Sequence, residues 1–131
     1  MVKVVAGVIE RDGKVFIVRR MKGDKLGNKW EFPGGKLESG ETPEEALRRE
    51  LREELDVETE VGAFICSSTY EYPHITVELL AYRVRLLSGE ITLHVHDASL
   101  WVAPGGLDAF DFPAANQAII GELKKKGVKG K

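Results

Sequence analysis

The sequence predicts an α+β fold built as a single domain, residues 1–131. Three observations support this: β-branched segments occur near the N-terminus and again after residue 58, a strongly amphipathic helix separates them, and a second helical pattern ends the chain. The 131 residues are enough for one hydrophobic core and too few for two. A hydrophobic content of 43% and a charged content of 31% fit an ordinary globular protein.

The chain should open with a β-hairpin. Val2–Ile9 reads as a strand, Asp12-Gly13 is a strong turn signal, and Lys14–Arg19 reads as the returning strand. The following segment, residues 21–29, has two glycines and alternating charges and reads as a loop.

A helix should begin at Thr42. Thr42 supplies a capping hydroxyl, Pro43 takes the first helical position, and Glu45 completes a capping box. The apolar stripe of this helix repeats at i, i+4 and i+8 and consists of Leu47, Leu51 and Leu55.

The same helix concentrates carboxylates along one edge of its apolar stripe. At about 100° per residue, Glu50, Glu53 and Glu54 share an arc of roughly 100°. The helix should carry its basic residues on the other side, namely Arg48, Arg49 and Arg52. Like charges at this spacing repel, and an all-oxygen donor set favours Mg²⁺ or Mn²⁺ as the compensating ion. A carbonyl of Gly34 or Gly35 is a further candidate ligand, and a solvated acidic face is the alternative interpretation.

The second half should contain two long antiparallel strands, 59–72 and 75–87, interrupted at Pro73-His74. Leu100–Val102 reads as a short strand. Ala114–Lys126 reads as a terminal helix, and the basic segment 124–131 as a flexible tail. The residues of this helix expected to face inward are Ala118, Ile119 and Leu123.

Composition excludes several function classes. The net charge of −2 argues against a sequence-independent grip on nucleic acid. Val2–Ile9 is too short to span a membrane, and no secretion signal pattern follows it. Cys66 is the single cysteine, so the chain forms no intramolecular disulfide. We therefore expect a cytoplasmic protein without a membrane or nucleic-acid partner, as a monomer or homodimer.

The segment Gly35–Val57 resembles the Nudix box, G-x5-E-x7-R-E-U-x-E-E-x-G-U, in which U is apolar. The fixed positions filled here are Gly35, Glu41, Arg49, Glu50, Leu51, Glu53, Glu54 and Val57. The exception is Asp56 in place of glycine, and we expect Asp56 to take the left-handed conformation that ends the helix. The resemblance implies an α/β/α sandwich with a mixed β-sheet between helices, and hydrolysis of a nucleoside diphosphate linked to another group.

Other segments resemble the MutT-like group of this family, which includes 8-oxo-dGTP diphosphatase and CTP pyrophosphohydrolase. They are Phe16–Arg20, Trp30–Lys36, Glu71–Thr76 and Asp111–Asn116. The likeness implies that Arg20 contacts the nucleotide and that Asn116 reads the base through its carboxamide. Phe32 and His74 are further substrate-binding candidates. From the residues alone, Phe32 is as consistent with core packing, and Asn116 with local capping.

One departure concerns the loop before Trp101. MutT-like proteins usually have a glutamate that binds metal or serves as general base at the position where this chain has Val95. His94, His96 and Asp97 are candidates to replace it, and the two histidines would share a face if the segment were a strand.

The predicted function is hydrolysis of a modified nucleoside triphosphate, 8-oxo-dGTP foremost, to monophosphate and pyrophosphate. The expected catalytic residues are Glu50, Glu53 and Arg49, the last pairing with Glu41 or a neighbour. The expected ligands of Mg²⁺ are Glu50, Glu53, Glu54 and Gly34. Three alternatives remain. The substrate could be a pyrimidine nucleotide such as CTP, or another Nudix substrate (ADP-ribose, a sugar nucleotide or a dinucleoside polyphosphate). The third alternative is a catalytically weak nucleotide-binding module.

Overall fold

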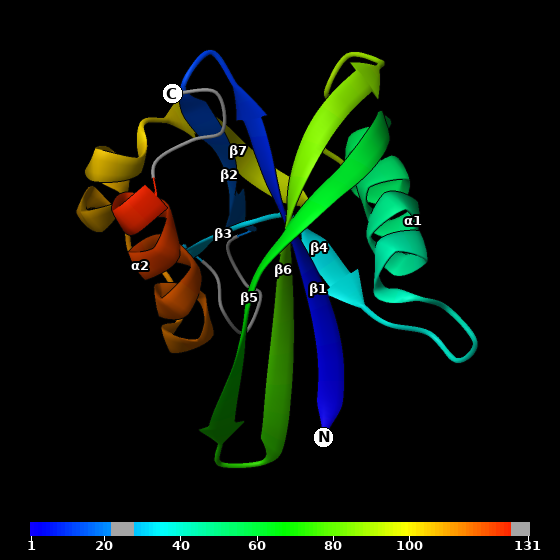
Figure 1. Cartoon of the computed structure of the whole chain (residues 1–131), viewed down its shortest axis with the longest axis vertical. Helices are drawn as coiled ribbons and strands as arrows, with labels where there is room; N and C mark the ends of the chain where they lie inside the picture. Colours follow the sequence, from blue (N-terminus) through cyan, green and yellow to red (C-terminus); the bar gives the residue numbers. More distant parts are fainter. Residues whose placement is uncertain (22–27, 127–131) are drawn as a thin grey trace.

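The computed structural model describes residues 1–21 and 28–126 and has the predicted α+β architecture (Figure 1). Its elements are β1 (Val2–Arg11), β2 (Lys14–Arg20), β3 (Trp30–Glu31), β4 (Gly34–Lys36), α1 (Pro43–Leu55), β5 (Glu58–Tyr72), β6 (Ile75–Ser88), β7 (His96–Val102), the 3-10 turns η1 (Pro104–Ala109) and η2 (Ala114–Asn116), and α2 (Gln117–Lys126). Most of the loop expected at residues 21–29, and the tail beyond Lys126, lie outside the described residues.

The strands form one mixed sheet in two wings that share β1. Along most of its length β1 pairs in parallel with β6, which in turn pairs antiparallel with β5. At its far end β1 turns through Asp12-Gly13 into β2, as predicted, and β2 lies between β3 and β7. The parallel pairing of β1 and β6 has no signal in the local sequence, because it joins strands about seventy residues apart.

The two helices cover opposite faces of the sheet (Figure 1). Alternate residues of a strand point to opposite faces, so Val5 and Ile9 of β1 pack in the cluster with α1 while Ala6 and Val8 pack in the cluster with α2. The α1 side is completed by the predicted stripe, whose residues Leu47, Leu51 and Leu55 are all fully buried. The α/β/α arrangement implied by the resemblance is thereby confirmed.

Two local predictions were wrong. Ala118 is exposed, and Ile120 is buried in its place, because the chain makes the 3-10 turn η2 before α2 begins at Gln117 and this shifts the helical phase. The short strand expected at Leu100–Val102 begins four residues earlier, at His96. No helix in the described part of the chain is long and apolar enough to cross a membrane.

Candidate active site

The glycine turn lies directly against the first carboxylate of α1. A β-carbon on Gly35 would come within 2.3 Å of the Glu50 carboxylate carbon, and one on Gly34 within 1.9 Å of the Val5 carbonyl oxygen. The obstacle at Gly34 is backbone, so only glycine lets β4 lie this close to β1, whereas a side chain at position 35 would displace the Glu50 carboxylate. The β4 backbone is thereby fixed against Glu50.

Both ends of α1 are set as predicted. Thr42 accepts a hydrogen bond from the Glu45 amide at 3.1 Å, and the Glu45 carboxylate accepts one from the Thr42 amide at 2.9 Å. At the other end, Asp56 has φ 61° and ψ 34°, the left-handed conformation expected of the residue that replaces glycine. Its carboxylate lies 2.8 Å from the Nε2 atom of His94.

Arg49 joins the loop to the helix. Its Nε and Nη2 atoms donate to the two oxygens of Glu41 at 2.7 and 3.0 Å, which is the pairing we predicted. Its Nη1 atom donates to Glu50 at 3.0 Å and to Glu53 at 3.4 Å, and its Nη2 to the Lys36 carbonyl at 3.1 Å. Hydrogen bonding to Glu41 raises the pKa of Arg49 and lowers that of Glu41. Arg49 starts on the other side of the helix from the box carboxylates, and its long side chain crosses the helix surface to reach them.

The three box glutamates lie in different environments. Glu53 is 59% exposed, whereas Glu50 is 15% exposed. Burial raises the pKa of Glu50 against the opposing effect of Arg49. Burial, with the neighbouring charges of Glu50 and Glu31, raises the pKa of Glu54 to about 8. The Oε1 atom of Glu54 is buried and has no hydrogen-bond partner in the described structure.

The carboxylate groups of this site fit a divalent cation. A buried, unpartnered carboxylate oxygen beside two other carboxylates is costly, and a hard cation with oxygen ligands removes that cost. In the described residues no three acidic, histidine or cysteine side chains are already gathered around one point. Binding by all three glutamates therefore requires side-chain rotation, which the exposed Glu53 permits.

A pocket of about 180 Å³ extends from the glycine turn to the residues before α2. It is lined by three of the predicted substrate-binding residues, Arg20, Phe32 and Asn116, together with Gly34 and Gly35. Phe32 is only 3% exposed and stacks on Phe112 with ring centroids 5.4 Å apart. Phe32 therefore has both of the roles that we considered, since it packs in the core and also lines the pocket.

Two other predicted positions lie elsewhere. His74 lies in the exposed turn between β5 and β6 and does not line this pocket. Val95 is 49% exposed and immediately precedes β7. The two flanking histidines diverge, because His94 contacts Asp56 while His96 is buried and contacts Glu31 at 2.9 Å. In the described structure they do not form the metal-binding pair that we considered.

Glu31 was missed by the sequence analysis. It lines the pocket, its charge raises the pKa of Glu54, and it pairs with Arg20 at 3.1 Å. The sequence places Glu31 directly before Phe32 and the glycine turn, and this position could have indicated a site residue. A two-residue strand is too short, however, to show the periodicity that identifies which face a residue occupies.

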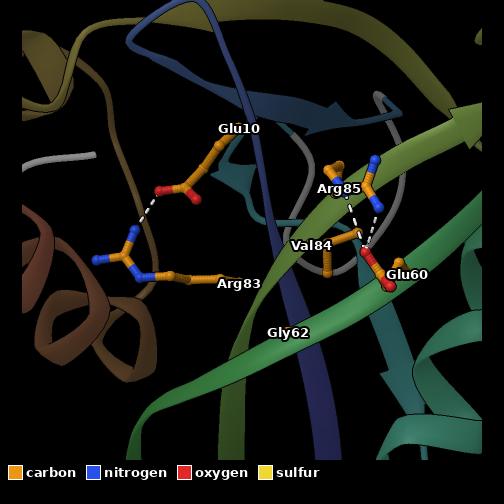
Figure 2. A pocket seen from close by; sticks show the side chains of 6 residues that line it. All are labelled: Glu10, Glu60, Gly62, Arg83, Val84 and Arg85. Carbon is orange, nitrogen blue, oxygen red and sulfur yellow. Dashed lines mark hydrogen bonds and ion pairs between the residues drawn. The ribbon is translucent and has the colours of Figure 1, made fainter. Parts of the chain in front are cut away.

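A second pocket, of about 220 Å³, lies at the other end of the paired strands β1 and β6 (Figure 2). Figure 2 shows that its charged side chains pair across the strands, Glu10 with Arg83 and Glu60 with Arg85. It contains none of the box residues, so we place the candidate site at the glycine turn.

The chain is similar to known proteins over most of its length. The family model of the NUDIX domain matches residues 4–122. CTP pyrophosphohydrolase of Escherichia coli (strain K12) is 39% identical over 115 residues, which cover 88% of this chain and 84% of the relative. The 8-oxo-dGTP diphosphatase of the same strain is 36% identical over 124 residues, covering 94% and 96%. The solution structure of the E. coli ORF135 protein superposes with a TM-score of 0.87 at 34% identity, covering 95% of this chain and 89% of that one.

Proposed function

The chain belongs to the NUDIX domain family and is a Nudix hydrolase, and from this premise we propose that it cleaves nucleoside triphosphates to the monophosphate and pyrophosphate. The observation that carries the proposal is the continuity of the pocket. One pocket is lined by Phe32 and Asn116 and also by Gly34 and Gly35, and the Glu50 carboxylate lies against Gly35. A nucleotide whose base lies at Asn116 and whose phosphates lie at the glycine turn has its phosphates beside the box carboxylates.

Glu50, Glu53 and Glu54 are the proposed ligands of Mg²⁺, with the Gly34 carbonyl as a fourth candidate. When bound, the ion supplies charge neutralisation for the phosphate oxygens in the transition state. Arg49 holds Glu50 and the loop residue Glu41 in fixed positions relative to one another. Because the hydrogen-bond donors of Arg49 are engaged by these groups, we assign Arg49 a positioning role.

Glu50 is our candidate for the group that accepts a proton from the attacking water. Burial raises its pKa above the ordinary value of a glutamate, and a raised pKa makes a carboxylate a stronger base. Arg49 fixes its orientation at 3.0 Å. A Glu50→Gln variant keeps the size of the side chain and removes its basicity, so kcat should fall at least about a hundredfold while binding of the nucleoside monophosphate persists.

We propose 8-oxo-dGTP as the preferred substrate. Asn116 is 8% exposed and lines the pocket, and its carboxamide offers both a donor and an acceptor to a purine edge. Two relatives that this chain matches over most of their length are named 8-oxo-dGTP diphosphatase. Replacement of Asn116 by Ala should lower kcat/KM for 8-oxo-dGTP more than for dGTP. Equal losses on both nucleotides would remove Asn116 as the reader of the oxidised base.

A pyrimidine nucleotide is the second candidate substrate. The relative at 39% identity is named a CTP pyrophosphohydrolase, and the same cleavage chemistry serves either base. Comparison of kcat/KM for CTP, 5-methyl-dCTP and 8-oxo-dGTP under one set of conditions separates the two proposals.

A further inference from the structure

Three polar side chains from three neighbouring strands are hydrogen-bonded in series beside the pocket. They are Arg20 of β2, Glu31 of β3 and His96 of β7, and β2 lies between the other two strands (Figure 1). The Nε atom of Arg20 donates to one oxygen of Glu31 at 3.1 Å. The Nε2 atom of His96 lies 2.9 Å from the other oxygen of Glu31.

Strand register explains why these side chains meet. Glu31 is paired with Val18, and Arg20 is paired with His96. Paired residues share a face of the sheet, as do alternate residues of one strand. Because Val18 packs in the core cluster with α1, the three polar side chains also point to the α1 side, where Glu54 lies.

A register shift places the histidine in this series. Arg19 is paired with Ala98, but the next residue, Arg20, is paired with His96, so Asp97 is an additional residue in β7. Without this shift Asp97 would be opposite Arg20. Asp97 instead contacts Arg19 at 2.8 Å. An irregularity of this kind re-aims a side chain.

The geometry indicates what each group does. His96 has a side chain only 2% exposed, so its position is fixed by packing. Both carboxylate oxygens of Glu31 are engaged, one by His96 and one by Arg20. Arg20 lines the pocket, and its positive charge acts on Glu54. Glu31 therefore connects a fixed imidazole to a guanidinium that lines the pocket and acts on Glu54.

We propose that His96 and Glu31 are positioning residues that hold the Arg20 guanidinium where it meets the phosphates of the nucleotide. The substrate in this statement rests on the proposed function, whereas the coupling of His96 to Arg20 through Glu31 does not.

The coupling can be measured without substrate or metal. In protein labelled with ¹⁵N-arginine and kept in EDTA, the Nε–H resonance of Arg20 is identified by its loss in Arg20→Lys. His96→Leu should shift this resonance toward that of free arginine and speed its exchange with water about tenfold. His96→Gln retains an amide nitrogen as a donor to Glu31 and should preserve most of the signal. The Nε–H of Arg52, which donates to Glu58 at 2.9 Å, serves as the internal control.

An unchanged Arg20 resonance in His96→Leu would overturn the proposal. If that buried substitution prevents folding, Glu31→Gln makes the same test from the other side, because it leaves His96 in place and removes the charge that holds Arg20. The proposal then fails if Arg20 is unaffected in Glu31→Gln.

Kinetics tests the purpose of the coupling. Glu31→Gln and His96→Leu should each raise the KM for a nucleoside triphosphate, by about tenfold for Glu31→Gln, with kcat within about threefold. The double variant should be no worse than Glu31→Gln alone, since His96 acts through Glu31. Additive losses, or losses confined to kcat, would contradict this role.

Arg19→Gln, on the opposite face of β2, is the matched control, and its KM should change less than about twofold. If the wild-type protein turns over no triphosphate, the proposed function fails while the arginine resonance still decides the coupling.

Discussion

Replacement of Glu54 by Gln should stabilise the metal-free protein at neutral pH, although it removes a proposed metal ligand. The pKa of Glu54 rises from its ordinary value of 4.5 to about 8 on folding, mainly through burial. Between these two values the folded state binds one proton more than the unfolded state, so the free energy of unfolding falls as pH rises through this window. At 1.36 kcal/mol per pH unit, the cost reaches about 4 kcal/mol at pH 7.5. Solvent in the adjoining pocket lowers this value, and we expect about 2 to 4 kcal/mol.

Urea unfolding in EDTA at pH 5.5 and pH 7.5 measures this cost. Glu54→Gln should exceed the wild type by about 2 to 4 kcal/mol at pH 7.5 and by less than about 1.5 kcal/mol at pH 5.5. Glu53→Gln, at an exposed position on the same helix, should change stability by less than about 0.5 kcal/mol at either pH. Addition of Mg²⁺ should stabilise the wild type and leave Glu54→Gln nearly unchanged. A variant no more stable than the wild type at pH 7.5 would refute the reasoning, because the buried charge would then carry no cost.

Three further substitutions test other parts of the site. Glu53→Gln should leave the circular dichroism spectrum unchanged and reduce kcat/KM at least about a hundredfold, and retained turnover with normal metal dependence would remove Glu53 from the metal site. Arg49→Lys loses the two-pronged contact with Glu41 and should cost about 1 to 3 kcal/mol in unfolding free energy with a clear loss of kcat, whereas wild-type values for both would show that a simple positive charge suffices. Asp56→Gly should be more stable than Asp56→Ala by about 1 kcal/mol in urea, because only glycine takes the left-handed conformation without cost, and the opposite order would mean that the conformation of Asp56 carries no strain.

Local chemistry was sufficient to predict much of the fold. The Thr42 cap, the buried Leu47, Leu51 and Leu55, the turn at Asp12-Gly13 and the left-handed Asp56 all depend on residues close in sequence, and the structure has each of them. The clustering of Arg20, Phe32 and Asn116 around one pocket was implied by resemblance, and no periodicity in the chain contains it.

The features that could not be predicted depend on long-range register. Glu31 and His96 are sixty-five residues apart and meet only because β2 pairs with both of their strands and β7 carries one additional residue. A shift of one residue would have presented Asp97 to Arg20 instead. Helix periodicity places the backbone of Arg49 on the opposite side of the helix from the carboxylates. A helical wheel describes where a side chain starts and not how far it reaches, so it does not contain the contact of Arg49 with Glu50.

The central claim is tested most directly by product analysis of one reaction. The protein is incubated with 8-oxo-dGTP, dGTP, CTP and ADP-ribose in Mg²⁺, kcat/KM is compared, and the products are resolved by ³¹P NMR. We expect monophosphate and pyrophosphate from the triphosphates, with a preference for 8-oxo-dGTP over dGTP of about a hundredfold, or about 2.7 kcal/mol at the transition state. Release of orthophosphate, or binding of every nucleotide without turnover, would contradict the account.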